Sequence, residues 1–176
     1  MPFSRLHEWI LGDLSAALQR LAFLPEAWRY RLVSAAVGQQ SRYFRTHRLR
    51  IVQIAPGQVS IRAGNRRALR NRAGALHAMA ASVAGEYAAA LVVAQHLPRG
   101  ARVRVKSVHA DFRKPLRGGV QAQASLDPAQ IGAAANAGGG RLRVPMKVID
   151  ETGAAPVRGH VDVVWSSAPR TPRAPA

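Results

Sequence analysis

The feature that most constrains this chain is an almost entirely apolar helical pattern over residues 75–96. Leu76 and Val83 fall on one side of it at helical spacing, and the other side carries mostly small residues. Pro98 and Gly100 end the pattern. Because a helix that is apolar on all sides is kept away from water, we expect this one to lie at the centre of the fold.

The segments around this helix alternate apolar and polar residues with the period of a β-strand. Val103 and Val105 are apolar at odd positions but Val108 at an even one, and this change of parity predicts a β-bulge near Lys106–Ser107. The predicted strands are 43–54, 57–63, 101–115, 118–126, 141–149 and 156–166, the first two forming a hairpin. Residues 127–140, rich in Ala and Gly, are predicted to be a flexible loop.

This order of elements predicts an α+β fold, with an antiparallel sheet wrapped around one long central helix. That is the hotdog arrangement. The predicted divisions are an N-terminal helical cap at 1–40, a hotdog domain at 41–166 and a disordered, Pro-rich tail at 167–176.

The cap is predicted to contain two helices, over residues 5–21 and 25–40. They have two interpretations. They pack on the domain that follows, or they make a weak contact with a membrane surface, for which Phe3, Trp9 and Phe23 are suitable anchors.

The composition excludes several classes of protein. The 176 residues include no cysteine, which excludes disulfide scaffolds, thiolate zinc sites and cysteine nucleophiles. No apolar run reaches the length of about 18 residues that a transmembrane helix needs. Glu8 and Asp13 interrupt the apolar stretch near the N-terminus, so we expect no signal peptide and a cytoplasmic protein.

The net charge is +17, from 26 Lys and Arg against 9 Asp and Glu. Such a charge favours polyanionic partners, although a solvated basic surface accounts for it equally well. The predicted strands alternate cations with apolar residues, which would place on one solvent face of the sheet Arg102, Arg104, Lys106, Arg141, Arg143, Lys147 and Arg158. No aromatic residues are interleaved with them, which counts against binding to single-stranded nucleic acid.

The segment before the central helix contains the richest chemistry. Asn71 and Gly74 precede the start of this helix, where the first amides have no partner within the helix. These amides and the Asn71 side chain would together form an oxyanion site. Glu86 is the only acid between Glu26 and Asp111, and a carboxylate buried in a core helix is costly unless it is paired or functional.

Helix geometry separates these groups within one chain. Glu86 lies nine residues after His77, which is a rise of about 13–14 Å and a rotation of roughly 180°. The two cannot form an acid–base pair. If an acid acts beside the Asn71 turn, it must be Glu86 of the partner subunit in a two-fold dimer.

The pattern Asn71-x-x-Gly74-x-x-His77, followed by Glu86, resembles the hotdog-fold acyl-CoA thioesterases of the phenylacetate-pathway type. Residues 65–80 and the segment Phe112-Arg113-Lys114-Pro115 are similar to an uncharacterised bacterial branch of that superfamily. The resemblance covers residues 25–166.

The resemblance implies hydrolysis of acyl-CoA thioesters by a homodimer or homotetramer. Asn71 would polarise the thioester carbonyl, the backbone amides near His77 and Ala78 would form the oxyanion hole, and Glu86 of the partner subunit would act as base or nucleophile. CoA would be part of the substrate, and no metal or other cofactor is implied. The candidates for contacts with the substrate are Arg72, Arg113, Lys114 and Arg117.

Alternatives remain for each residue. Asn71 would also serve as a turn or helix cap, His77 as a structural hydrogen-bonding residue, and Glu86 as the partner of Arg70 or Arg72 in an ion pair across an interface. The chain departs from the family pattern in ways that favour a non-catalytic protein that binds acyl-CoA or lipid, at Arg72, Ala75 and Ala78. A basic protein that binds nucleic acid or a membrane surface is the third hypothesis.

Overall fold

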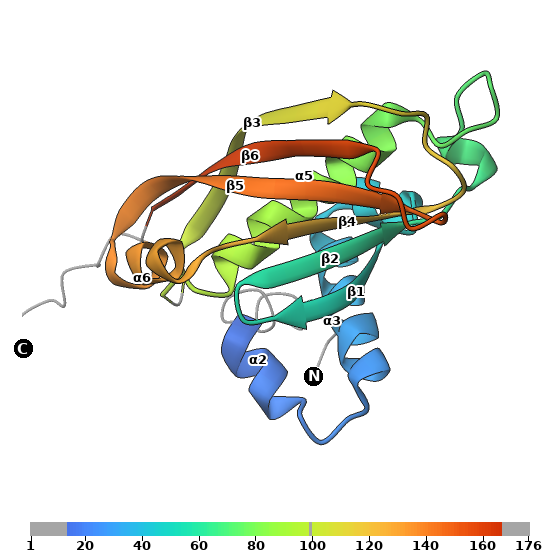
Figure 1. The fold of residues 1–176 in the computed structure, drawn as a ribbon. Coiled ribbons are helices and arrows are strands. Elements are labelled where there is room, and N and C mark those ends of the chain that lie inside the picture. Colours follow the sequence, from blue (N-terminus) through green and yellow to red (C-terminus); the bar gives the residue numbers. More distant parts are fainter. Residues whose placement is uncertain (1–13, 99, 167–176) are drawn as a thin grey trace, which may run out of the picture.

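The structure, a computed structural model, describes residues 14–98 and 100–166. A six-stranded sheet has the order β1-β2-β4-β5-β6-β3, and every neighbouring pair is antiparallel (Figure 1). The strands are β1 (Arg50–Ala55), β2 (Gln58–Ala63), β3 (Arg102–Phe112), β4 (Val120–Ser125), β5 (Gly139–Asp150) and β6 (Val157–Ser166). The predicted α+β class is therefore confirmed, and the antiparallel sheet is consistent with a hotdog fold.

Helices cover one face of this sheet. The longest, α5 (Ala78–Ala94), packs against five strands, β2 to β6, and buries ten of its residues. The other helices are α2 (Leu14–Arg20), α3 (Glu26–Gln40), α4 (Arg42–Thr46) and α6 (Pro128–Asn136), with a short 3₁₀ turn, η2 (Arg67–Leu69). Of these, α3 packs against β1 and α4.

Small residues let α5 lie close to the sheet. Ala81, Ala84 and Ala88 are completely buried, and a Cβ atom added to Gly85 would lie 2.3 Å from the sulfur of Met146 on β5. The apolar inner sides of the strands complete this core, including Ile61, Ala122, Val144 and Val163.

The predicted bulge in β3 is confirmed. The register between β3 and β6 shifts between Val105 and Ser107, so that Lys106 is the extra residue. A second shift, between Ile51 and Gln53 in β1, was not predicted.

The prediction of a strand from Tyr43 was wrong at its start. Residues Arg42–Thr46 form α4, because the Ser41 hydroxyl accepts a hydrogen bond from the Phe44 N–H and so caps a helical turn. The Phe44 ring is buried beneath this turn. The strand begins only at Arg50.

The prediction of a flexible loop over 127–140 was also wrong. Pro128–Asn136 form α6, which begins with a capping box between Asp127 and Gln130. Pro128 lies in the first turn of α6. A backbone N–H there would have no acceptor within the helix, so the N–H that proline lacks is not missed. Asp127, Pro128 and Gln130 are together a signal for a helix start, which the Ala- and Gly-rich composition of the segment obscured.

The predicted helix over 5–21 is described only from Leu14, and the predicted disordered tail at 167–176 lies outside the described residues. Phe3 and Trp9 also lie outside them. At the corner between α2 and α3, Phe23 is 79% exposed and Trp28 is 55% exposed. Membrane contact through this cap stays a prediction. No helix in the described part of the chain is long and apolar enough to cross a membrane.

Gly159 on β6 offers a test of the β3–β6 pairing. A Cβ atom at this position would lie 1.9 Å from the His109 carbonyl oxygen on β3, so Gly159→Ala must push the two strands apart. We expect the free energy of unfolding, measured with urea, to fall by about 1–3 kcal/mol.

The matched control is Gly132→Ala in α6, where an added Cβ atom meets nothing within 4 Å. This change should raise the free energy of unfolding by up to about 1 kcal/mol, because alanine is the better helix former. Equal stability of the two variants would contradict the described β3–β6 register.

Candidate active site

A tight turn precedes α5 and contains Asn71. The Asn71 N–H donates to the Ala75 carbonyl (2.8 Å), and the Gly74 N–H donates to the Asn71 carbonyl (3.0 Å). Gly74 has φ of +77°, a value that favours glycine. The turn is closed by a bridge between Arg70 and Leu76.

The Asn71 side chain is oriented by this turn. Its Oδ1 accepts hydrogen bonds from the N–H groups of Ala73 (3.0 Å) and Ala75 (3.2 Å). The capping role that the sequence left open therefore belongs to the side-chain oxygen. The Nδ2 group has no partner within residues 14–98 and 100–166, and it remains free to donate to another oxygen.

His77 caps the start of α5. Its Nδ1 accepts from the Met79 N–H (3.1 Å), and its own N–H donates to the Leu69 carbonyl (2.7 Å). The ring therefore acts as a hydrogen-bond acceptor that fixes the helix terminus. The Ala78 N–H lies at the first helical position and has no acceptor in the described part of the chain.

A shallow cavity of about 330 Å³ joins these donors to the segment that follows β3. Its lining includes Asn71 and Ala78 on one side and Arg113 and Lys114 on the other. The two basic residues are exposed, so their charges are available to a ligand at the mouth of the cavity.

Two predicted cations lie outside this lining. Arg72 is exposed on the turn, and Arg117 lies at the loop before β4, where its N–H donates to Asp150 (3.2 Å). The structure thus brings together Asn71, Ala78, Arg113 and Lys114 but neither Arg72 nor Arg117.

Glu86 lies in a different cavity, of about 460 Å³, beside the start of β3. Tyr87, Ala90, Val103 and Arg104 also line it. The Glu86 side chain is half-buried, and burial raises the pKa of its carboxyl above the usual value. Its carboxylate has no hydrogen bond or ion pair within the described residues, so no structural ion pair accounts for it in one chain.

Arg70, one of the partners considered for Glu86, is occupied elsewhere. Its guanidinium donates to the Asn65 side-chain oxygen (3.1 Å) and to the Asn65 carbonyl (3.0 Å). The loop before the Asn71 turn is held in this way.

Sequence reasoning missed Tyr87, which lines the Glu86 cavity. Its hydroxyl hydrogen-bonds to Ser41 at the start of α4, and its ring meets Phe44 edge-on at 5.1 Å. The sequence signal was available, because Tyr87 is the one aromatic residue within the Ala-rich pattern.

Tyr87 also borders a larger groove of about 950 Å³. The groove runs between the second half of α5, the start of β3 and the cap, and shares Tyr87, Ala90, Val103 and Arg104 with the Glu86 cavity. Leu14 and Val37 provide apolar walls from the cap helices. No group of three or more His, Asp or Glu side chains that could hold a metal occurs in the described residues.

Residues 29–165 match the family described as a domain of unknown function, DUF4442. The chain belongs to the DUF4442 family. No curated protein matches the sequence of this DUF4442 chain.

Solved structures similar to this DUF4442 chain include several thioesterases. A structural-genomics protein is 25% identical, with 88% of this chain and 99% of that chain covered and a TM-score of 0.67. A Pseudomonas aeruginosa protein named as a probable thioesterase is 21% identical, with 82% and 97% covered and a TM-score of 0.60. A Haemophilus influenzae thioesterase is 13% identical, with 82% and 94% covered and a TM-score of 0.66. At these identities, the last two similarities establish the fold alone.

The raised pKa of Glu86 predicts a pH-dependent stability effect. The folded state holds the Glu86 proton more tightly than the unfolded state, whose value is near 4.5. The free energy of unfolding therefore falls as pH rises from there through the raised pKa. We expect Glu86→Gln to be more stable than wild type at neutral pH.

The stability gain of Glu86→Gln should shrink as pH falls and vanish below about pH 4, where the carboxyl is protonated in both states. Urea unfolding at a series of pH values measures this difference. A neutral-pH loss of stability in Glu86→Gln would mean that the carboxylate has a stabilising partner.

Proposed function

We propose that this DUF4442 protein is an acyl-CoA thioesterase whose active site is shared between two subunits. One observation carries the proposal: the carboxylate of Glu86 and the amide donors of Asn71 and Ala78, which have no partners among the described residues, lie in cavities beside opposite ends of β3. The thioesterases among similar solved structures support the same chemistry. Asn71 and Glu86 resemble the phenylacetate-pathway type of motif, from which Ala78 departs.

The position of β3 supports a shared site. It is an edge strand of eleven residues, and within residues 14–98 and 100–166 it pairs only with β6, so its other edge offers backbone groups for pairing with a second copy. Val103 and Val105, near its start, border the Glu86 cavity, and Phe112, at its end, borders the Asn71 cavity. Antiparallel pairing of two β3 strands about a two-fold axis would bring the start of one beside the end of the other.

In this dimer, Glu86 of the partner subunit faces the donors of the Asn71 turn. As a base, the carboxylate takes a proton from water, and the resulting hydroxide attacks the thioester carbonyl. As a nucleophile, it attacks the carbonyl itself, and water then hydrolyses the anhydride. In both cases the Asn71 amide and the Ala78 N–H stabilise the oxyanion until the CoA thiolate leaves.

The surrounding surfaces suit the two parts of the substrate. Arg113 and Lys114 carry exposed positive charge at the rim of the Asn71 cavity, and we assign them to the CoA phosphates. The 950 Å³ groove continues from the Glu86 cavity between apolar residues of α5 and the cap, and we assign it to the acyl group. Arg72 and Arg117 remain candidates for outer contacts with CoA.

Substitution of either key group tests this mechanism. With a panel of acyl-CoAs and detection of the released thiol, Glu86→Gln should lower kcat/KM by about 10²–10⁴-fold. Asn71→Ala should lower it by about 10²–10³-fold. In the wild type, kcat/KM should rise with pH through the raised pKa of Glu86, because only the carboxylate acts.

Full activity of Glu86→Gln would contradict the mechanism. Arg42→Gln, on the exposed side of α4, is a control for the effect of a lost charge and should retain the wild-type rate.

Mixing the two inactive variants tests whether the site is shared. A hybrid dimer of one Glu86→Gln subunit and one Asn71→Ala subunit contains one site with both changes and one intact site. After random exchange of equal amounts, roughly a quarter of wild-type turnover should return, since half of the dimers are hybrids with one intact site each. If the subunits exchange but the mixture stays as inactive as its two components, then the Asn71 and Glu86 of each active site belong to the same chain.

A second function, binding of acyl-CoA without turnover, is favoured by one observation. Most of the residues of the 950 Å³ groove lie away from Asn71, Ala78 and Glu86, so the groove does not depend on them. Retention of a copurifying acyl-CoA by a wild type without hydrolysis would support this function.

A further inference from the structure

The face of the sheet opposite α5 carries an array of positive charge that the proposed thioesterase site does not use. No helix of the described residues covers the middle of this face, which is turned towards the viewer in front of α5 (Figure 1). Along these strands, residues that face α5 alternate with more polar residues on the outer face, most regularly in β5. The cations on this outer face include Arg62, Arg141, Arg143, Lys147 and Arg158.

Some of these cations lie directly opposite other cations on neighbouring strands. Lys147 on β5 lies directly opposite Arg158 on β6, which has Asp111 of β3 on its other side, and Arg50 on β1 lies opposite Arg62 on β2. Like charges in directly opposed positions destabilise a sheet. Arg62 gains only a 4.0 Å contact with Glu151, and neither Lys147 nor Arg158 forms an ion pair within the described residues.

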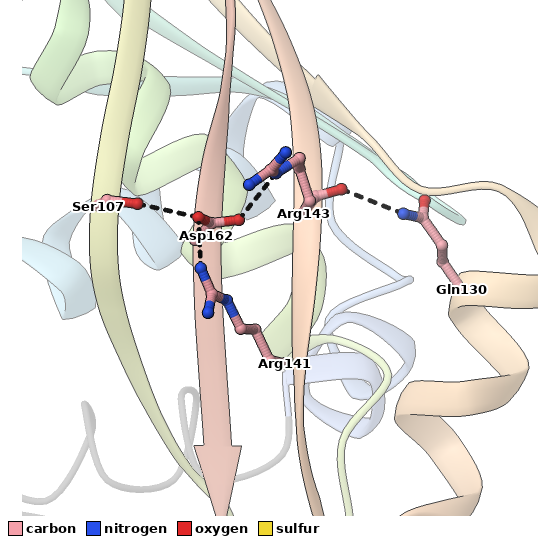
Figure 2. Close-up of polar contacts among 5 residues, drawn as sticks. All are labelled: Ser107, Gln130, Arg141, Arg143 and Asp162. Atoms are coloured by element: carbon pink, nitrogen blue, oxygen red, sulfur yellow. Dashed lines mark hydrogen bonds and ion pairs between the residues drawn. The ribbon is translucent and has the colours of Figure 1, made fainter.

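Nearer β3, a buried acid holds two of the arginines in place. Asp162 is only 4% exposed, and its carboxylate accepts hydrogen bonds from Arg141 (2.8 Å), Arg143 (3.1 Å) and the Ser107 hydroxyl (3.0 Å), as Figure 2 shows. Arg143 and Arg141 hold the pKa of Asp162 well below its usual range. The side chains of both arginines stay more than half exposed, so the cluster presents net positive charge to solvent.

The array does not suit a second copy of this chain. Stacking two outer faces would bring like charges together and desolvate them without partners. The large exposed apolar side chains of the described residues also lie elsewhere, on the cap, on α4 and α5 and at the end of β3. The charge of the face is complementary to an anionic surface.

We propose that the outer face of the sheet docks on an anionic phospholipid bilayer. The cations are spread in two dimensions across the strands, from Arg62 on β2 to Arg158 on β6, as phosphate headgroups are spread across a bilayer surface. Arginine binds phosphate oxygens through paired N–H donors, and each surface cation strengthens binding to an anionic membrane.

Nucleic acid fits this face less well. The face consists of strands, and in the part of the chain that the structure describes no helix or ribbon projects from it to enter a groove of a duplex. Its only rings in the described residues are the stacked imidazoles of His109 and His160, so it offers little for base stacking. If the outer face binds an anionic bilayer through charge alone, the attachment should be reversible and should weaken at high salt.

Co-sedimentation of the full chain with vesicles tests the proposal. We expect binding to vesicles of equal parts phosphatidylcholine and phosphatidylglycerol, release at high salt, and no binding to phosphatidylcholine alone. Lys147→Gln/Arg158→Gln should weaken binding about thirtyfold, since each cation contributes roughly a factor of five. The same double variant should be nearly as stable as wild type, because it removes the opposed like charges of Lys147 and Arg158 together with the opposed unlike charges of Arg158 and Asp111.

The matched control is Arg42→Gln/Arg67→Gln, which removes the same charge from α4 and η2 and should leave binding nearly unchanged. An equal loss in the control would mean that net charge binds the vesicles and this face does not, which overturns the proposal. Failure of the wild type to bind the anionic vesicles, or a preference for duplex DNA over them, overturns it too. Hydrolysis of acyl-CoA is not needed for any of these readouts.

Discussion

The close packing of α5 against the inner face of the sheet is the contact on which the rest of this structure depends. Ala81, Ala84 and Ala88 have no exposed surface, and Gly85 leaves space that the Met146 sulfur occupies. Larger side chains at these positions would force the helix away from the strands. Because α5 touches five of the six strands, its distance from the sheet sets the packing of most of the core.

Both ends of α5 are fixed by side chains. At the start, His77 accepts from the Met79 N–H, and at the end Gln95 donates to the Ala55 carbonyl (3.1 Å) while His96 accepts from the Gly57 N–H (3.2 Å). Burial lowers the pKa of His96, which favours the neutral, accepting ring. These contacts fix the position of α5 along its axis. Because Ala78 and Glu86 both lie on this helix, the distance between them is constant.

That separation has a consequence for the site. Ala78 and Glu86 lie on one rigid element and open into different cavities, and no side-chain movement can join them in one chain. Any chemistry that uses both groups must therefore combine two copies. The edge strand β3, which borders both cavities, is the element through which the proposed dimer would do so.

The sequence predicted the parts of this fold that depend on simple periodicity. The apolar pattern located α5, and the change of parity at Lys106–Ser107 located the bulge in β3. The segments missed, α4 and α6, are short helices that depend on single caps, Ser41 and Asp127, rather than on a repeating pattern. The strand from Tyr43 was assigned too early, because the alternation of apolar and polar residues begins only at Leu49, next to the observed start at Arg50.

Candidate site residues were harder to interpret from the sequence. The spacing identified Asn71 and Glu86 as unusual, but it could not show which atoms of Asn71 are occupied, because that depends on the turn to Ala75. Tyr87 was missed because its role comes from Ser41, which is distant in the sequence. Contacts of this kind arise only when the cap meets α5.

Stability alone does not account for two features on opposite sides of the sheet. Burial of Glu86 costs free energy on the helical side, where the described residues give its carboxylate no partner, and on the outer side Lys147 is opposed by Gln123 and Arg158 and by no acid. Asp162 shows that this sheet can neutralise its arginines where an acid is available. Charges left uncompensated in an otherwise well-packed fold are typical of surfaces that meet a ligand. The two sides would then meet different ones, a thioester at the helix and phosphate headgroups at the outer face.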